Sequence, residues 1–125
     1  MLLFHLLFSV APYVDAEAVS ITVSNGNSIT IEWDKRHIRG DGVAHYYEIW
    51  YKTRSEENYG TTARQEIGND SRQHFTLRLR YWNTEYDVFI VLIFQTGNSG
   101  PQPGRPSDIL RVQTGIFIHY ELFLE

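Results

Sequence analysis

Three side chains in one short stretch of the sequence are of the types that bind divalent metal ions. His37, Asp41 and His45 follow one another at intervals of four residues. On a helix this spacing would place all three on one face, but Gly40 and Gly42 disfavour a helix there. Side chains of a loop could still ligate a metal. We favour ordinary solvated residues, and we predict no metal or other cofactor.

The same stretch contains Arg39-Gly40-Asp41, the tripeptide through which many extracellular adhesion ligands engage integrins. A given string of three residues arises by chance at about one position in 8,000, so a single occurrence is weak support for function. The glycines favour exposure of the loop but also leave it poorly ordered, which costs binding free energy. We favour coincidence in a flexible loop, with integrin contact as the alternative.

Groups for catalysis are scarce. The chain has no cysteine, so it has no thiol nucleophile, no thiolate metal site and no disulfide. Two acidic pairs, Glu56 with Glu57 and Asp15 with Glu17, have no neighbour in the sequence that would shift a carboxyl pKa. We therefore predict that the protein is not an enzyme.

The charge balance argues against nucleic acid as a partner. The chain of 125 residues has 11 Lys and Arg against 15 Asp and Glu, a formal net charge of −4. A general nucleic-acid binder would present a basic face to the phosphates. Arg72, Arg78 and Arg80 are the nearest approach to such a face, and their spacing fits a solvated strand better.

These residues belong to a chain whose dominant hydrophobic period is two. The stretch SITIEWD alternates with Ile29, Ile31 and Trp33 on one face, and HYYEIWYKT with Tyr47 and Ile49. Alternation continues in HFTLRL, EYDVFIVLIF and ILRVQT, and residues typical of turns separate the segments. No long segment has helical periodicity. The pattern predicts one domain, an antiparallel sandwich of about seven short strands.

The order of these segments resembles the fibronectin type III domain over residues 18–115. The resemblance lies in Trp33, the alternation of Tyr47, Ile49 and Tyr51, the stretch NTEYDVFIVLI with Tyr86, and the closing GRPSDILRVQTG. It implies an all-β, immunoglobulin-like fold of two antiparallel sheets and seven strands. We expect a core that contains the following residues: Trp33, Tyr47, Ile49, Leu77, Tyr86, Val88 and Ile90.

Tyr86 also takes the place of the family's tyrosine corner, whose hydroxyl bonds to upstream backbone. The family usually has a leucine six residues before this tyrosine, where this sequence has Arg80 and the leucine is Leu79. A one-residue insertion or bulge in the connection would account for the difference.

The two ends of the chain differ from its middle. Residues 1–16 resemble a secretory signal peptide, because a short apolar run leads to small residues suitable for cleavage after Ala16 or Ala18. No Lys or Arg precedes the run and His5 interrupts it, so an apolar N-terminal extension stays open. Residues 116–125 form an apolar tail about half as long as a membrane span. We expect no membrane span, and a tail that is poorly ordered or loosely docked.

Three surface positions are candidates for contact or modification. Trp50 and Phe89 face away from the core by strand parity, as do Val91 and Ile93. Two large aromatics on an outer sheet face indicate a partner surface, unless Tyr46 and the stems of Lys52 and nearby arginines cover them. Asn69-Asp70-Ser71 is an acceptor sequence for N-glycosylation in a predicted turn.

We interpret the chain as a secreted, extracellular module that binds proteins or mediates cell adhesion, within a larger receptor or matrix protein. A passive structural spacer is one alternative. An accessory domain of an extracellular enzyme or receptor phosphatase is another. The sequence does not identify the partner, the parent protein or the oligomeric state.

Overall fold

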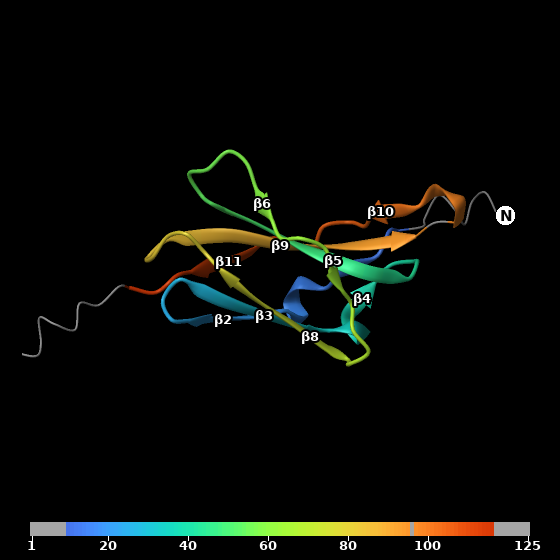
Figure 1. Ribbon diagram of the computed structural model, residues 1–125, viewed down its shortest axis with the longest axis horizontal. Helices are drawn as coiled ribbons and strands as arrows, with labels where there is room; N and C mark the ends of the chain where they lie inside the picture. The colour runs from blue at the N-terminus through green and yellow to red at the C-terminus, as the bar shows by residue number, and fades with distance from the viewer. Residues whose placement is uncertain (1–9, 96, 117–125) are drawn as a thin grey trace, which may run out of the picture.

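Two antiparallel sheets face each other in the structure, a computed structural model that describes residues 10–95 and 97–116 (Figure 1). The smaller sheet has the order β2, β3, β8, with bounds Ser20–Ser24, Ser28–Asp34 and Arg72–Arg78. The centre of the larger sheet is the pair β5 (Ala44–Thr53) and β9 (Glu85–Gln95). The predicted all-β sandwich is confirmed.

Short segments extend the larger sheet. β6 (Gly60–Thr61) and β7 (Gln65–Glu66) pair with β5, while β10 (Pro101–Pro103) and β11 (Leu110–Gln113) pair with β9. β1 (Tyr13–Val14) pairs with β4 (Ile38–Arg39) in a separate two-stranded sheet. Three single turns of 3-10 helix connect strands: η1 (Ala16–Ala18), η2 (Lys35–His37) and η3 (Gly97–Ser99). The five alternating stretches of the sequence each correspond to one strand, and the other strand segments lie outside them.

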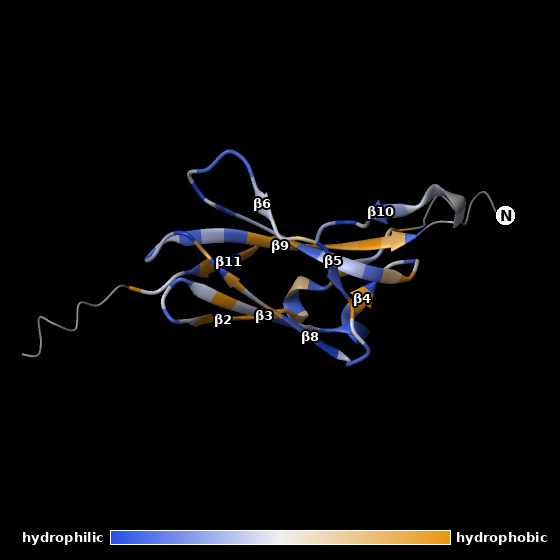
Figure 2. Cartoon of the chain, viewed as in Figure 1, coloured by the Kyte–Doolittle hydropathy of each residue, from blue (hydrophilic) through white to orange (hydrophobic). Residues whose placement is uncertain are grey.

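The core lies between β3 and β8 on one side and β5 and β9 on the other. Trp33 is fully buried and meets the Tyr47 ring edge-on, with ring centroids 5.4 Å apart and planes at 89°. Ile49, Tyr86, Val88 and Ile90 are buried with them, as the alternating pattern requires. Hydrophobic residues concentrate along β9, whereas the connection from β5 to β6 is hydrophilic (Figure 2).

One expected core residue, Leu77, is less buried than we predicted, and Leu79 is more deeply buried. Leu77 is only half-buried against the core, whereas Leu79, just after β8, is 2% exposed. The backbone N–H of Leu79 donates to the carbonyl of Asn27 at 2.8 Å, and the Asn27 side chain donates back to the Leu79 carbonyl at 2.9 Å. These bonds hold Leu79 in the core, while Leu77 packs against the edge of the core from its place opposite Ile29.

The connection from β8 to β9 forms a tyrosine corner. The Tyr86 hydroxyl accepts a hydrogen bond from the backbone N–H of Tyr81 at 3.1 Å. Asn83 has a positive φ of 48°, a conformation that asparagine tolerates better than most residues.

The ordered domain begins earlier than residue 18. Val14 is fully buried, and β1 aligns Val14 with Ile38 and Tyr13 with Arg39. The N–H of Asp15 continues this pairing by donating to the His37 carbonyl at 3.1 Å. A cut after Ala16 would therefore remove a strand of this fold. Residues 1–9 lie outside the described residues, and the signal peptide stays a prediction.

The last strand, β11, ends at Gln113. Thr114 is buried, and the N–H of Gly115 donates to the Gly26 carbonyl at 2.6 Å. Ile116 follows and is 70% exposed. The rest of the apolar tail, residues 117–125, lies outside the described residues, so our expectation for it stays untested.

Candidate partner-binding surface

Trp50 and Phe89 lie side by side on the outer face of the larger sheet. The two residues are direct partners in the β5–β9 ladder, and their rings stack with centroids 5.9 Å apart and planes at 10°. Each is partly buried. The alternation that sends Ile49 and Ile90 into the core sends these two rings to the opposite side.

A third ring, which the sequence analysis missed, completes this group. Tyr59 comes from the connection between β5 and β6, which stands away from the sheet in Figure 1. Its ring meets Phe89 edge-on at 4.9 Å, and the ammonium of Lys52 lies 5.4 Å from its centroid. We name Trp50, Tyr59 and Phe89 the outer aromatic cluster. Tyr59 sits in an irregular connection, where no periodicity marks which side chain returns to the sheet.

The side chains that cover this face agree only in part with the prediction, which named Tyr46 and Lys52 with nearby arginines. Lys52 does contribute, but the covering ring comes from Tyr59, while Tyr46 lies near the far end of β5 and is 38% exposed. Val91 and Ile93 share the outward phase, yet they are 6% and 2% exposed. The outer face is thus buried at Val91 and Ile93 and partly exposed at the outer aromatic cluster.

Charged residues border the cluster and are paired with one another. The Trp50 indole N–H donates to Glu48 Oε1 at 3.3 Å, and Arg64 Nε lies 3.5 Å from Glu48 Oε2. On the other side Arg111 Nε lies 3.4 Å from Asp87 Oδ1. Because these charges are already compensated, a partner could cover this border without leaving a lone ion buried.

Ile109 extends the apolar surface towards β11. It directly precedes β11 and is 54% exposed. The β9–β11 register sets Leu110 opposite Val88, which brings Ile109 level with Phe89. The outer aromatic cluster therefore has an exposed aliphatic residue beside it.

Arg39-Gly40-Asp41 makes contacts with distant parts of the chain that the sequence analysis did not predict. Arg39 belongs to β4, and the N–H of Asp41 donates to the carbonyl of Val10 at 2.7 Å. The Arg39 guanidinium donates to the Arg36 carbonyl at 3.2 Å and lies 3.8 Å from the carboxylate of Asp15. Long-range contacts with the N-terminal segment, which the sequence pattern did not reveal, order this stretch.

The three candidate metal ligands lie on different elements. His37 ends η2, Asp41 follows β4 and His45 lies in β5. Within the described ranges, 10–95 and 97–116, no group of three or more His, Asp or Glu side chains could hold a metal ion. The four-residue spacing therefore does not bring these ligands together here.

The arginines of the smaller sheet are arranged along β8 and its continuation. Arg72 forms an ion pair with Glu32 on the neighbouring strand at 2.8 Å. The guanidinium of Arg80 lies 5.3 Å from the centroid of the Tyr81 ring. These contacts are typical of a solvated sheet surface.

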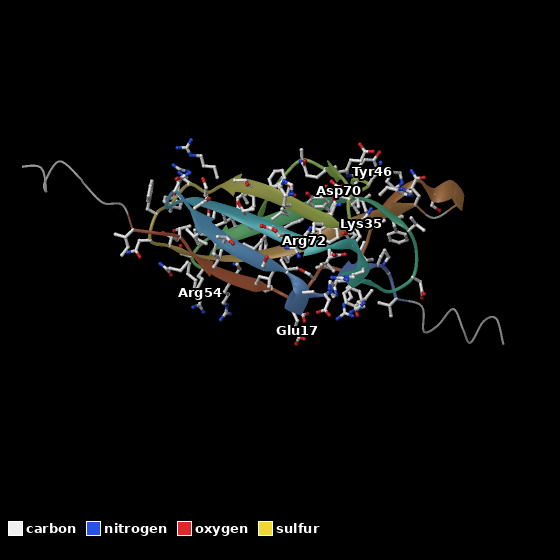
Figure 3. The ribbon with its side chains drawn as sticks, turned by 90° about the horizontal axis from the view of Figure 1, so that it is seen from below. Glu17, Lys35, Tyr46, Arg54, Asp70 and Arg72 are labelled. Atoms are coloured by element: carbon white, nitrogen blue, oxygen red, sulfur yellow. The ribbon has the colours of Figure 1, made fainter. Side chains whose placement is uncertain are left out.

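The acceptor sequence at Asn69 lies in an exposed bend between β7 and β8. The ammonium of Lys35 donates to the carbonyls of Gly68 at 2.8 Å and Asn69 at 3.0 Å. Figure 3 shows Lys35 and Asp70 towards the same end of the molecule as Tyr46. The backbone of the bend is therefore fixed while its side chains face solvent.

Perturbed titratable groups do not converge on a reactive centre. Burial raises the pKa of Tyr47 and, as the largest effect, that of Tyr86. The backbone N–H of Thr53, which donates to Glu56 Oε1 at 2.9 Å, lowers the pKa of Glu56. Each shift has a structural cause in the core or in a turn.

In the part of the chain that is described, no helix combines the length and hydrophobicity needed to cross a membrane.

Comparisons with known proteins identify similar folds. No family model and no curated protein matches the chain. Among solved structures, one described as a myokine covers 86% of this chain and 99% of its own, with a TM-score of 0.57 and 18% identity. The solution structure of the third fibronectin III domain of human KIAA0343 protein covers 89% of both chains, with a TM-score of 0.58 and 17% identity. Likeness at this level of identity shows the fold.

Proposed function

We propose that this chain, which has the fibronectin type III fold, is an extracellular protein-binding or adhesion module of a larger receptor or matrix protein. The observation that supports this proposal is the outer aromatic cluster. Trp50, Tyr59 and Phe89 are partly exposed on a sheet face, outside the core. Aromatic residues are enriched at the centres of protein interfaces, where they supply much of the binding free energy.

Two other functions are compatible with this fold, because function in such domains resides on the surface. A passive spacer would use the cluster only to brace the connection from β5 to β6. An accessory domain of an extracellular enzyme or receptor phosphatase would bind within its own protein. We propose a module without catalytic activity of its own in either case.

Binding to immobilised extracellular domains tests the proposal. The double substitution Trp50→Ala with Phe89→Thr removes the stacked pair and should weaken partner binding by about tenfold or more. Tyr46→Ala is the matched control, because Tyr46 is exposed on β5 but lies apart from the cluster. Equal affinity of both variants and the wild type would favour the spacer.

Export through an N-terminal leader and a glycan at Asn69 are part of this proposal. The leader can be tested by N-terminal sequencing of protein secreted from eukaryotic cells. For the glycan, Asn69→Gln should abolish a mass decrease that an N-glycosidase produces in the secreted wild type. An intact Met1 on cytosolic protein would contradict export, and unchanged mass in both proteins would contradict the glycan.

A further inference from the structure

We propose that the edge strand β2 binds a second copy of the same chain, so that the two smaller sheets join into one continuous antiparallel sheet. A two-fold axis through Thr22 relates the two copies. β2 begins at Ser20, beyond both cleavage positions expected for a leader, so the inference holds with or without one. The strand belongs to the opposite sheet from the outer aromatic cluster, and the inference does not depend on that cluster.

In the part of the chain that the structure describes, β2 pairs with β3 alone and has a free edge (Figure 1). In an antiparallel pair every second residue directs its N–H and C=O groups to the neighbouring strand, and the residues between them direct theirs away. β2 therefore presents backbone donors and acceptors along its free side. Another extended strand can bind to this arrangement.

The edge of β2 lacks the features by which natural sheets discourage such pairing. Its five residues, Ser20–Ser24, include no charged residue, proline or glycine. By contrast, β8 carries Arg72 and Arg78. β10, at an edge of the larger sheet, contains Pro101 and Pro103. Because charges and prolines oppose contact between edges, β2 is the best suited of these three strands to accept a second chain.

The sequence of β2 is self-complementary for antiparallel pairing. It reads Ser, Ile, Thr, Val, Ser, so each class of residue recurs at the mirror position about Thr22. A two-fold axis at Thr22 sets Ile21 of one copy opposite Val23 of the other, and Ser20 opposite Ser24. Polar residues thus meet polar residues on one face of the joined sheet, and aliphatic residues meet on the other.

The inner face of the joined sheet is a continuous apolar layer. The β2–β3 register sets Ile21 opposite Ile31 and Val23 opposite Ile29. Both isoleucines of β3 are fully buried, whereas Val23 is 37% exposed. Pairing with a second copy brings Val23 against Ile21 of that copy, which removes apolar surface from water.

The outer face of the smaller sheet carries a row of threonines that ends at β2. Thr22 is opposite Thr30, and the Thr30 hydroxyl oxygen lies 3.0 Å from that of Thr76 on β8. A second copy extends this row, because Thr22 then faces Thr22 of the other copy across the axis. Threonine pairs on neighbouring strands are favourable, whereas like charges directly opposite each other are not. A single substitution at position 22 therefore enters the interface twice.

Sedimentation velocity of the full chain over a range of concentrations tests the proposal. Two five-residue strands form a contact smaller than a standard interface, so we expect a monomer at low concentration and a reversible dimer at high concentration. Thr22→Lys should weaken association by about fivefold, because two lysines meet at the axis. Thr22→Glu should do the same, and an equimolar mixture of the two variants should restore the dimer. Thr76→Lys is the matched control, since Thr76 is exposed on the same face but lies two strands from the axis.

A single cysteine tests the register of the pairing. The chain has no cysteine, so Thr22→Cys and Thr76→Cys each introduce a unique thiol. With a short bismaleimide, thiols at position 22 should form covalent dimers about tenfold faster than thiols at position 76, because pairing raises their effective concentration. Circular dichroism confirms that each variant is folded.

A wild type that stays monomeric at every concentration would overturn the proposal and leave the edge to a strand of another protein. Association that both charged variants at position 22 leave unchanged would also overturn it, because the dimer would then use another surface. Equal cross-linking rates at positions 22 and 76 would contradict the register. The variant with Trp50→Ala and Phe89→Thr should keep the dimer, so this test and that of the proposed function can fail separately.

Discussion

The strand pair β5 and β9 carries aromatic residues on both faces, and the two faces differ in what surrounds the rings. On the inner face Tyr47 meets Trp33 from the facing sheet, and both rings are almost completely buried. On the outer face Trp50 stacks on Phe89, and Tyr59 meets the Phe89 ring edge-on. The same residue types thus stabilise the fold on one face and remain available for contact on the other.

The largest expected effect distinguishes Trp33 from Trp50. Trp33→Ala should destabilise the fold by about 3 to 5 kcal/mol, because it leaves a large cavity between the sheets. Trp50→Ala should cost about 1 kcal/mol or less, since its ring is only partly buried. Urea unfolding of both variants measures the difference. Equal losses would show that the outer face is as much a core as the inner one.

The hydroxyl of Tyr86 provides the next test of the inner face. Tyr86→Phe keeps the ring but leaves the N–H of Tyr81 without its acceptor. We expect a loss of about 1 to 2 kcal/mol, the usual range for a polar group that loses its partner. Tyr59→Phe is the control on the outer face and should leave the unfolding midpoint unchanged. No loss in Tyr86→Phe would mean that water replaces the tyrosine hydroxyl at no cost.

Alkaline pH should weaken the inner face selectively. Burial raises the pKa of Tyr47 above its ordinary value of 10.0, and the pKa of Tyr86 is raised as well. Above pH 10 the unfolded chain therefore loses these protons before the folded chain does. Stability is complete below pH 10 and falls as the pH rises towards the folded-state values.

Thermal unfolding between pH 8 and pH 11 measures this dependence. Tyr47→Phe should flatten the alkaline part of the curve, whereas Tyr46→Phe, at an exposed position of the same strand, should leave it as in the wild type. Parallel curves for all three proteins would contradict the assignment to buried tyrosines.

The strands of both faces could be predicted from the sequence because their signal is local. Alternation along one strand is enough to place Ile49 inward and Trp50 outward. Contacts between distant segments left no such signal. Tyr59 returns to the sheet from an irregular connection, and the bond of Leu79 to Asn27 joins residues 52 positions apart. Sequence periodicity cannot reveal either contact.

Gly40 illustrates the same limit in the tripeptide Arg39-Gly40-Asp41. In the sequence, glycines beside Asp41 indicate a flexible loop, because glycine permits many backbone conformations. In the structure Gly40 is required because the backbone of Val10 and Ala11 crosses it. The residue type was informative, but its cause lies 29 or more residues away in the chain.

The smallest expected effect concerns the apolar tail, residues 116–125. A tail that covered Trp50 and Phe89 would bury the outer face as the core buries the inner one. Deletion of residues 116–125 should leave the melting temperature unchanged and raise solubility, because the last described contacts of the fold end at Gly115 and Ile116 is exposed. The competing arrangement has the tail covering Trp50 and Phe89. Deletion would then lower the melting temperature by several degrees, since about 1 kcal/mol corresponds to roughly 4 to 8 °C in a domain of this size. It would also make Trp50 fluorescence more accessible to quenchers. That result would remove the contrast between the faces, because both aromatic pairs would then be buried within one chain.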